Sequence, residues 1–377
     1  MKLKADRATL LKALAHVQSV VERRNTIPIL ANVKIEVRDG RLALTATDME
    51  IAIVEDVPAG ASRNGACTAP AATLYEIVRK LPDHAEVELD HAGGDAQLRL
   101  KAGRYATSLV VLPTDDFPSM NAGMLPHEFH LPAETLRGLI DRTRFAISTE
   151  ETRYYLNGIF LHAPEGDAGK VLRAVATDGH RLARVEVEPV PAGAASMPGV
   201  IVPRKTVNEL RKLLEEQSGE VEIKLSDTRV QFRVGPVLLT SKLIDGTFPE
   251  YERVIPRDND KVLRVGKRDF SDAVGRVAAI SSERSRPVKL SLDRDLLVLS
   301  AASPEQGTAT EELDGDRVKY EATPLEIGFQ ARYLNDITDQ VPDKNQVEFR
   351  FADGSAPTVV QDAADPSALY VLMPMRV

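Results

Sequence analysis

The chain repeats itself about every 130 residues, and this repeat restricts its possible folds more than any other feature. Residues 46–52 read ATDMEIA and residues 176–183 read ATDGHRLA, which places Asp48 130 residues before Asp178. A period of about one third of a 377-residue chain predicts three similar domains. Turn-rich stretches near 122–126 and 256–260 divide them into 1–124, 125–256 and 257–377.

Each third contains two segments whose apolar residues recur at the spacing of one helical face. Leu74, Ile77, Val78 and Leu81 follow this spacing until Pro82 ends it. The six helical windows are 7–24, 72–81, 134–146, 203–216, 267–280 and 330–340. Alternation of apolar and polar residues predicts half-buried antiparallel strands over 33–37, 42–45, 221–225 and 347–351. The expected fold is therefore α+β, with two helices backing antiparallel sheets in each of three repeated domains.

Composition narrows the class of protein. The single cysteine, Cys67, cannot form an intramolecular disulfide, which favours a reducing compartment. No apolar run has the length of a signal peptide or a membrane span, so we expect a cytoplasmic protein. The formal net charge of -8 argues, taken alone, against nucleic acid as a partner, because phosphate neutralisation dominates binding to duplexes.

The placement of the charges reverses that inference. The six helical windows hold 17 Lys and Arg against 11 Asp and Glu, so they carry +6 and the rest of the chain carries -14. A helix that buries its apolar stripe turns its charged residues to solvent. Basic helices on an acidic body predict a positive surface for nucleic acid, although a single surface helix commonly carries Lys and Arg without any partner.

Asp48, Asp178 and His180 are the residues that would suggest an active site, as metal ligands or as an acid and base pair. No sequence motif supports catalysis, because the chain lacks HExxH, a phosphate-binding GxxxxGK[ST] loop and a nucleophile elbow. The Thr-Asp pair recurs at Thr47 without a histidine, which favours a turn in which Asp accepts hydrogen bonds from backbone amides. A metal-dependent hydrolase using these residues is the rival hypothesis.

Two further stretches could bind a partner. Tyr154 and Tyr155 beside Arg153 could stack on nucleic acid, or could be strand residues that fill core and rim. The C-terminal stretch YVLMPMRV has two methionines that could form an adaptable apolar peptide site, or could be a final edge strand.

The whole chain closely resembles the bacterial DNA polymerase III beta-subunit family of processivity sliding clamps. The resemblance rests on stretches in all three repeats, namely TIPIL at 26–30, TATD at 45–48, RYYLNG at 153–158, ATDGHRL at 176–182, VPRK at 202–205, TSKL at 240–243, FPEY at 248–251, LEIGF at 325–329 and MPMR at 373–376. It implies a head-to-tail homodimer that forms a ring of six domains, with duplex DNA passing through a helix-lined hole. The implied activity is tethering of a polymerase, without catalysis, cofactor or metal.

The resemblance also implies two sets of site residues. The expected DNA contacts are Arg24, Arg79, Tyr154, Tyr155, Arg204 and Lys205. A pocket for short peptide motifs is expected from Leu156, Thr177, Gly179, His180, Arg181, Leu182, Pro249, Arg253, Val254, Val371, Met373, Pro374, Met375 and Arg376. The polymerase III alpha subunit, the clamp loader, other polymerases and repair proteins would compete for that pocket, and no membrane is involved.

Some positions depart from the family pattern. A basic DNA contact is replaced by Ala72 and an amide by Glu150, and a pocket-rim aromatic is Ser285, while Pro357 follows Ser355 and Ala356. Thr107 and Ile280 only partly match the apolar dimer contacts of the family. A second clamp copy that confers resistance to a pocket-directed inhibitor is an alternative within the family.

Overall fold

The computed structural model describes residues 1–22, 26–166, 169–280 and 287–376, and its contacts divide the chain into two compact units. Unit 1 comprises residues 1–136, 191–198 and 205–243, and unit 2 comprises residues 137–190, 199–204 and 244–377. The units follow the sheets, since the middle third of the chain gives strands to a sheet in each. The domain bounds inferred from the sequence stay a prediction.

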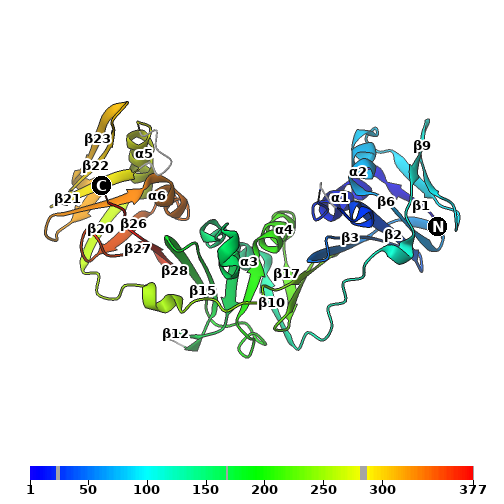
Figure 1. The fold of residues 1–377 in the computed structure, drawn as a ribbon, viewed down its shortest axis with the longest axis horizontal. Helices are drawn as coiled ribbons and strands as arrows, with labels where there is room; N and C mark the ends of the chain where they lie inside the picture. Colours follow the sequence, from blue (N-terminus) through cyan, green and yellow to red (C-terminus); the bar gives the residue numbers. More distant parts are fainter. Residues whose placement is uncertain (23–25, 167–168, 281–286, 377) are drawn as a thin grey trace. The chain divides into compact units, whose positions relative to one another are not determined.

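Unit 1 contains two antiparallel sheets (Figure 1). The five-stranded sheet has the order β5 (Gly60–Arg63), β1 (Lys2–Asp6), β7 (Glu86–Asp90), β8 (Gln97–Ala102) and β9 (Tyr105–Val110). The eight-stranded sheet has the order β10 (His127–Pro132), β17 (Glu220–Leu225), β18 (Arg229–Val234), β19 (Val237–Lys242), β4 (Ile51–Val57), β3 (Arg41–Thr47), β2 (Asn32–Arg38) and β6 (Gly65–Pro70). The pairing of β19 with β4 joins strands of the first two repeats in one sheet.

Unit 2 is built in the same way. Its nine-stranded sheet has the order β16 (Val200–Pro203), β11 (Gly158–His162), β14 (Leu172–Thr177), β15 (Arg181–Val187), β28 (Asp365–Leu372), β27 (Thr358–Asp362), β26 (Gln346–Phe351), β20 (Lys261–Gly266) and β24 (Val318–Tyr320). A four-stranded sheet contains β23 (Gly307–Asp314), β22 (Leu296–Ser303), β21 (Pro287–Asp293) and β25 (Leu325–Gln330), and β12 (Glu165–Gly166) pairs with β13 (Gly169–Lys170). Here the pairing of β15 with β28 joins strands of the second and third repeats.

The α+β fold with two helices per repeat is confirmed. The helices are α1 (Arg7–Gln18), α2 (Ala71–Lys80), α3 (Ala133–Asp141), α4 (Arg204–Glu215), α5 (Lys267–Ala278) and α6 (Ala331–Thr338). The Asp6 carboxylate caps α1 by accepting a hydrogen bond from the Thr9 amide. The windows extended too far at 7–24 and 134–146, where the helices end at Gln18 and Asp141. Helix α1 packs against α2, and α5 packs against α6 (Figure 1).

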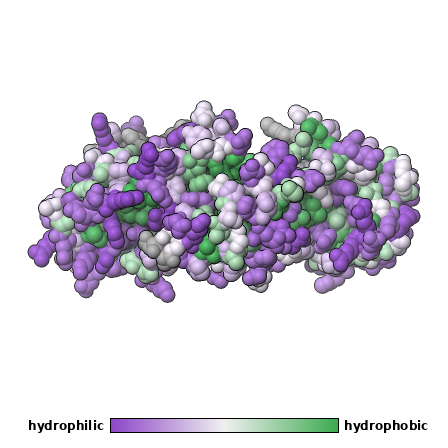
Figure 2. All heavy atoms as spheres, turned by 90° about the horizontal axis from the view of Figure 1, so that it is seen from below, coloured by the Kyte–Doolittle hydropathy of each residue, from purple (hydrophilic) through white to green (hydrophobic). Residues whose placement is uncertain are grey.

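The alternating segments form strands as predicted. In β17, Val221, Ile223 and Leu225 are buried, while the residues between them reach the surface. The apolar residues visible in Figure 2 form small separate groups on a mainly hydrophilic face. No helix in the described part of the chain is long and apolar enough to cross a membrane.

Two of the alternatives drawn from the sequence are wrong. Tyr154 and Tyr155 lie in a short 3-10 helix, η4 (Glu151–Leu156), and not in a strand. The C-terminal strand β28 is not an edge strand, because it pairs with β15 on one side and with β27 on the other. The adjacent tyrosines and the terminal position of the last strand were weak signals, because neither shows which strands pair over long distances along the chain.

Candidate functional site

A mainly apolar pocket of about 260 Å³ opens in unit 2, where β15 pairs with β28. The side chains of Leu156, Leu182, Tyr251 and Val371 line it and also belong to a buried cluster of the core. The complete lining is Arg153, Tyr155, Leu156, Thr177, Gly179, Arg181, Leu182, Pro249, Glu250, Tyr251, Val254, Val371 and Met373. Because the core packs behind these walls, the pocket is preformed and suits an apolar side chain.

The structure brings together nine of the residues expected at the pocket, namely Leu156, Thr177, Gly179, Arg181, Leu182, Pro249, Val254, Val371 and Met373. His180, Arg253, Pro374, Met375 and Arg376 are not among the lining residues. Residue-by-residue transfer from the family missed Arg153, Tyr155, Glu250 and Tyr251. All four lie inside the RYYLNG and FPEY stretches, so each whole stretch was the better signal.

A turn at residues 177–181, the second Thr-Asp turn, forms one wall of the pocket. The Asp178 carboxylate accepts hydrogen bonds from the amides of His180 and Arg181, at 2.9 and 3.0 Å. The Thr177 hydroxyl donates to the Arg181 carbonyl and accepts from the Gly179 amide. Gly179 has φ +89°, a conformation that glycine adopts at little cost. Asp178 therefore acts as the turn residue that the repeat predicts.

The same turn occurs in unit 1 at residues 47–51, the first Thr-Asp turn. The Asp48 carboxylate accepts hydrogen bonds from the amides of Glu50 and Ile51, both at 2.8 Å. Its second oxygen accepts from the Lys205 ammonium, which also reaches the Val20 carbonyl and Glu22. Asp48 and Asp178 are thus both occupied by amides and a cation, and this argues against a hydrolytic role for them.

Lys205 was expected to contact DNA, but its ammonium is already engaged. Burial alone would lower the pKa of Lys205, but hydrogen bonds and charges from Asp48 and Glu22 outweigh it and raise that pKa. Arg79 is paired with Glu76 on its own helix at 2.8 Å. Arg204 is exposed at the start of α4 and has no ion pair with another described residue, which leaves its guanidinium available for a phosphate.

The remaining DNA candidates differ in exposure. Tyr154 is 54% exposed, and its ring meets the edge of the Tyr155 ring at 5.8 Å. Tyr155 is only partly exposed and lines the apolar pocket. Arg24 lies outside the described residues, as does Ser285.

A buried polar network supports the pocket from behind. The Arg173 guanidinium donates to the Tyr251 hydroxyl and to Glu252, both at 2.6 Å, and to Glu186. His162 lies 3.0 Å from the same Tyr251 hydroxyl. Burial and the charge of Arg173 lower the pKa of His162 to about 4, so its ring is neutral near pH 7. The network fixes the Tyr251 ring, which is part of the pocket wall.

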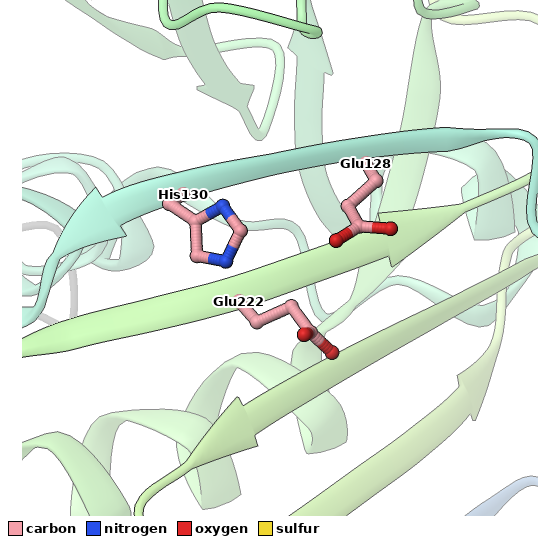
Figure 3. A group of neighbouring side chains, drawn as sticks. All are labelled: Glu128, His130 and Glu222. Atoms are coloured by element: carbon pink, nitrogen blue, oxygen red, sulfur yellow. The ribbon is translucent and has the colours of Figure 1, made fainter.

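One group among the described residues has side chains spaced for a metal ion, namely Glu128, His130 and Glu222 (Figure 3). His130 on β10 is the strand partner of Glu222 on β17. The Lys224 ammonium lies 3.3 Å from each of the two carboxylates and already balances their charge. Burial of this group is slight, and we assign no metal to it.

Three repeats of two helices and antiparallel strands, joined edge to edge, define the DNA-clamp class of fold. Family models agree along the chain: the N-terminal, central and C-terminal domains of the DNA polymerase III beta subunit match residues 1–121, 130–250 and 252–376. The chain belongs to the DNA polymerase III beta-subunit family of sliding clamps.

Individual relatives support this family over full length. The beta sliding clamp of Caulobacter vibrioides is 52% identical and that of Escherichia coli K12 is 38% identical, each with 100% of both chains covered. A crystal structure of the Caulobacter crescentus clamp superposes with a TM-score of 0.95 at 51% identity over 100% of both chains. A Bartonella birtlesii clamp bound to griselimycin superposes with a TM-score of 0.95 at 47% identity, also over 100% of both chains.

Proposed function

We propose that this clamp encircles duplex DNA and tethers a replicative polymerase and other replication and repair proteins to it, without chemistry of its own. The full-length match to sliding clamps is the observation that carries the proposal. The excess of positive charge on the helices supports it, because contacts to phosphates hold a duplex without reading its sequence and permit sliding. The cytoplasm and a polymerase III holoenzyme are the proposed setting.

We propose DNA contacts from Arg24, Arg79, Tyr154, Tyr155 and Arg204, with Arg204 and Tyr154 as the most available described residues. Lys205 belongs to the same set, but its bonds to Asp48 and Val20 hold the first Thr-Asp turn in place. We call Lys205 the brace of that turn. Loss of one phosphate contact should reduce the slope of log K for DNA binding against log salt concentration by about one.

Closure of a ring requires two chains, and the sheet edges offer a way to join them. Strand β9 is an edge strand of unit 1, and β23 is an edge strand of unit 2. Strand β23 carries Glu312 as well as Glu311 and Asp314, which pair with Arg276 and Arg317 of the same chain. We propose that β9 of one chain pairs with β23 of a second copy, head to tail, since unpaired strand edges favour addition of a strand. We also propose that the three domains of each chain have the bounds 1–124, 125–256 and 257–377.

The pocket of unit 2 is the proposed site for short apolar peptide motifs, shared by the polymerase III alpha subunit, the clamp loader, other polymerases and repair proteins. Its apolar walls suit one or two buried side chains of a peptide. His180, Arg253, Pro374, Met375 and Arg376 stay proposed contacts at its margin. One pocket per chain would make the partners compete.

Retention on DNA tests the encircling function. After loading onto nicked circular DNA, the protein should remain bound until the DNA is linearised, and divalent metal should not be needed for retention. The mass in solution should be near twice 41.2 kDa. Retention on circles no longer than on linear DNA would refute the proposal.

Deletion of residues 373–377 tests the pocket. Met373 is a wall residue, so the deletion should abolish binding of a peptide from the polymerase while the dimer persists. An unchanged affinity for the peptide would remove the pocket assignment and leave the encircling function untouched.

A further inference from the structure

Arg181 is a buried cation in the wall of the pocket. Its side chain is only 4% exposed, although Arg181 lines the pocket together with neighbouring Gly179 and Leu182. The guanidinium donates to the Asp178 carboxylate at 3.1 Å, to the Phe145 carbonyl at 2.6 Å and to the Asp336 carboxylate at 2.5 Å. A buried charge of this kind requires such partners, because it has lost its hydration.

Two aromatic rings enclose the same guanidinium. Its central carbon lies 4.4 Å from the ring centre of Tyr333 and 5.1 Å from that of Phe145. Arginine stacks on aromatic faces while its planar donors remain in the plane, so the rings and the acceptors together fix one orientation. The Arg181 side chain therefore has little freedom to move.

Asp336 comes from a different repeat than the other acceptors. It lies on α6 in the third repeat, whereas Asp178 and Phe145 belong to the second. The pocket has the same dual origin, because Leu182 on β15 is the strand partner of Val371 on β28. The ion pair of Arg181 with Asp336 thus connects the two repeats that both contribute residues to the pocket.

We infer that Asp336 is a positioning residue of the peptide pocket, which it shapes through Arg181 and the second Thr-Asp turn without touching the peptide. This role rests on the proposed peptide-binding function. Loss of the Asp336 charge would leave Arg181 under-paired, and the turn would relax toward the space that the peptide fills. Peptide affinity should then fall through faster dissociation, since the wall is less well formed before binding.

A second ion pair between the same repeats provides the matched control. Arg142, just after α3, donates to Asp365 at the start of β28 at 2.9 Å, and neither residue lines the pocket. If the only role of Asp336 were to connect the repeats, loss of its charge and loss of the Asp365 charge would weaken peptide binding equally. The two pairs therefore separate positioning from general stability.

The experiment uses the full-length dimer and a fluorescent peptide from the polymerase alpha subunit. Asp336→Asn, which preserves shape and removes charge, should weaken the peptide about 10-fold, mainly in its dissociation rate. Asp365→Asn should leave the affinity within about twofold. In an Arg181→Met background, Asp336→Asn should have little further effect, because the coupling acts through Arg181. Thermal unfolding of each variant verifies that it is folded.

The outcomes separate this inference from the proposed function. Wild-type affinity in a folded Asp336→Asn variant would overturn the positioning role. Equal losses in Asp336→Asn and Asp365→Asn would overturn it as well, since the ion pair would then be a general joint between repeats. Failure of the wild-type protein to bind the peptide would instead refute the pocket assignment itself.

Discussion

The two Thr-Asp turns share one backbone scaffold, and the second of them borders the apolar pocket of unit 2. In each, the Asp carboxylate accepts two amides and the Thr hydroxyl donates to the carbonyl four residues later. In each, a residue at or just after the end of a neighbouring strand of the same chain donates a backbone hydrogen bond to the turn. The Lys242 amide donates to the Glu50 carbonyl in the first, and the Met373 amide donates to the His180 carbonyl in the second, both at 2.9 Å.

The side chains on this common scaffold differ between the two turns. At the first turn, Lys242 and Glu50 form an ion pair at 2.8 Å. At the second turn, Met373 takes the place of the lysine and lines the pocket, beside His180 in the place of the glutamate. The repeat therefore preserves backbone geometry while the side chains at these two positions differ. The pocket also requires the walls that Leu156, Tyr251 and Val371 supply, which the turn alone does not provide.

The largest effect is expected at the brace of the first turn. Lys205→Met should lower the free energy of unfolding by about 3 kcal/mol, because the Asp48 carboxylate, only 7% exposed, would lose its cationic partner. Urea unfolding measures this loss. The salt dependence of DNA retention should remain unchanged if Lys205 acts mainly as a brace, whereas a slope reduced by about one would identify it as a phosphate contact.

Lys224→Met is the matched control. Lys224 is about as exposed as Lys205, at 32% against 36%, but its partners Glu128 and Glu222 are more exposed than Asp48. Its loss should cost less than about 1 kcal/mol. Equal costs for the two lysines would show that burial of the partner does not distinguish the brace.

These contrasts show what could be read from the sequence. The repeat and the helical spacing predicted the helices and strands, because those signals are local. The Asp turn was also predictable, since Asp48 and Asp178 recur in the same short motif. The roles of Lys205 and Asp336 were not, because they depend on contacts 157 and 155 residues away. Pairing over such distances leaves no periodic trace in a single chain.

The second prediction is that the stabilities of the two regions depend on pH in opposite directions. In unit 2, His162 has its pKa lowered to about 4, below the 6.5 of an unfolded chain. The unfolded state then binds the extra proton between these values, so stability falls as the pH falls through that window. After allowance for the partial exposure of the ring, the loss should be about 2 kcal/mol.

His16 in unit 1 has the opposite shift. Burial alone would lower its pKa, but the hydrogen bond and charge of Glu55, at 2.8 Å, and the charge of Glu216 raise it above its ordinary value. Stability from this pair is present below the unfolded pKa and is lost as pH rises through the folded pKa. Unfolding from pH 4 to 8 should show a smaller acid loss in His162→Gln and a smaller alkaline loss in His16→Gln. The same slope in both variants as in the wild type would reject these pairings.

The third prediction compares the left-handed residue of each turn. Gly179→Ala should destabilise the protein by about 1 kcal/mol, because φ is +89° and the new Cβ would lie 2.5 Å from Nη1 of Arg153. Peptide affinity should fall too, since the displaced Arg153 lines the pocket. Met49 occupies the equivalent position with φ +76°. Met49→Gly should therefore raise the free energy of unfolding, by less than about 1 kcal/mol, without any effect on peptide binding.

The smallest effect is expected for the ion pair between Lys242 and Glu50 at the first turn. A double-mutant cycle of Lys242→Met and Glu50→Gln should give a coupling below about 1 kcal/mol, because both side chains are exposed and salt screens them. The coupling should vanish at about 1 M salt. Lys242→Met should also leave the stoichiometry at one peptide per chain, since a methionine alone supplies none of the walls that Leu156, Tyr251 and Val371 give the second turn. Two peptides per chain in a titration would mean that the shared scaffold is nearly sufficient for a pocket and that the charge pair is what closes the first turn.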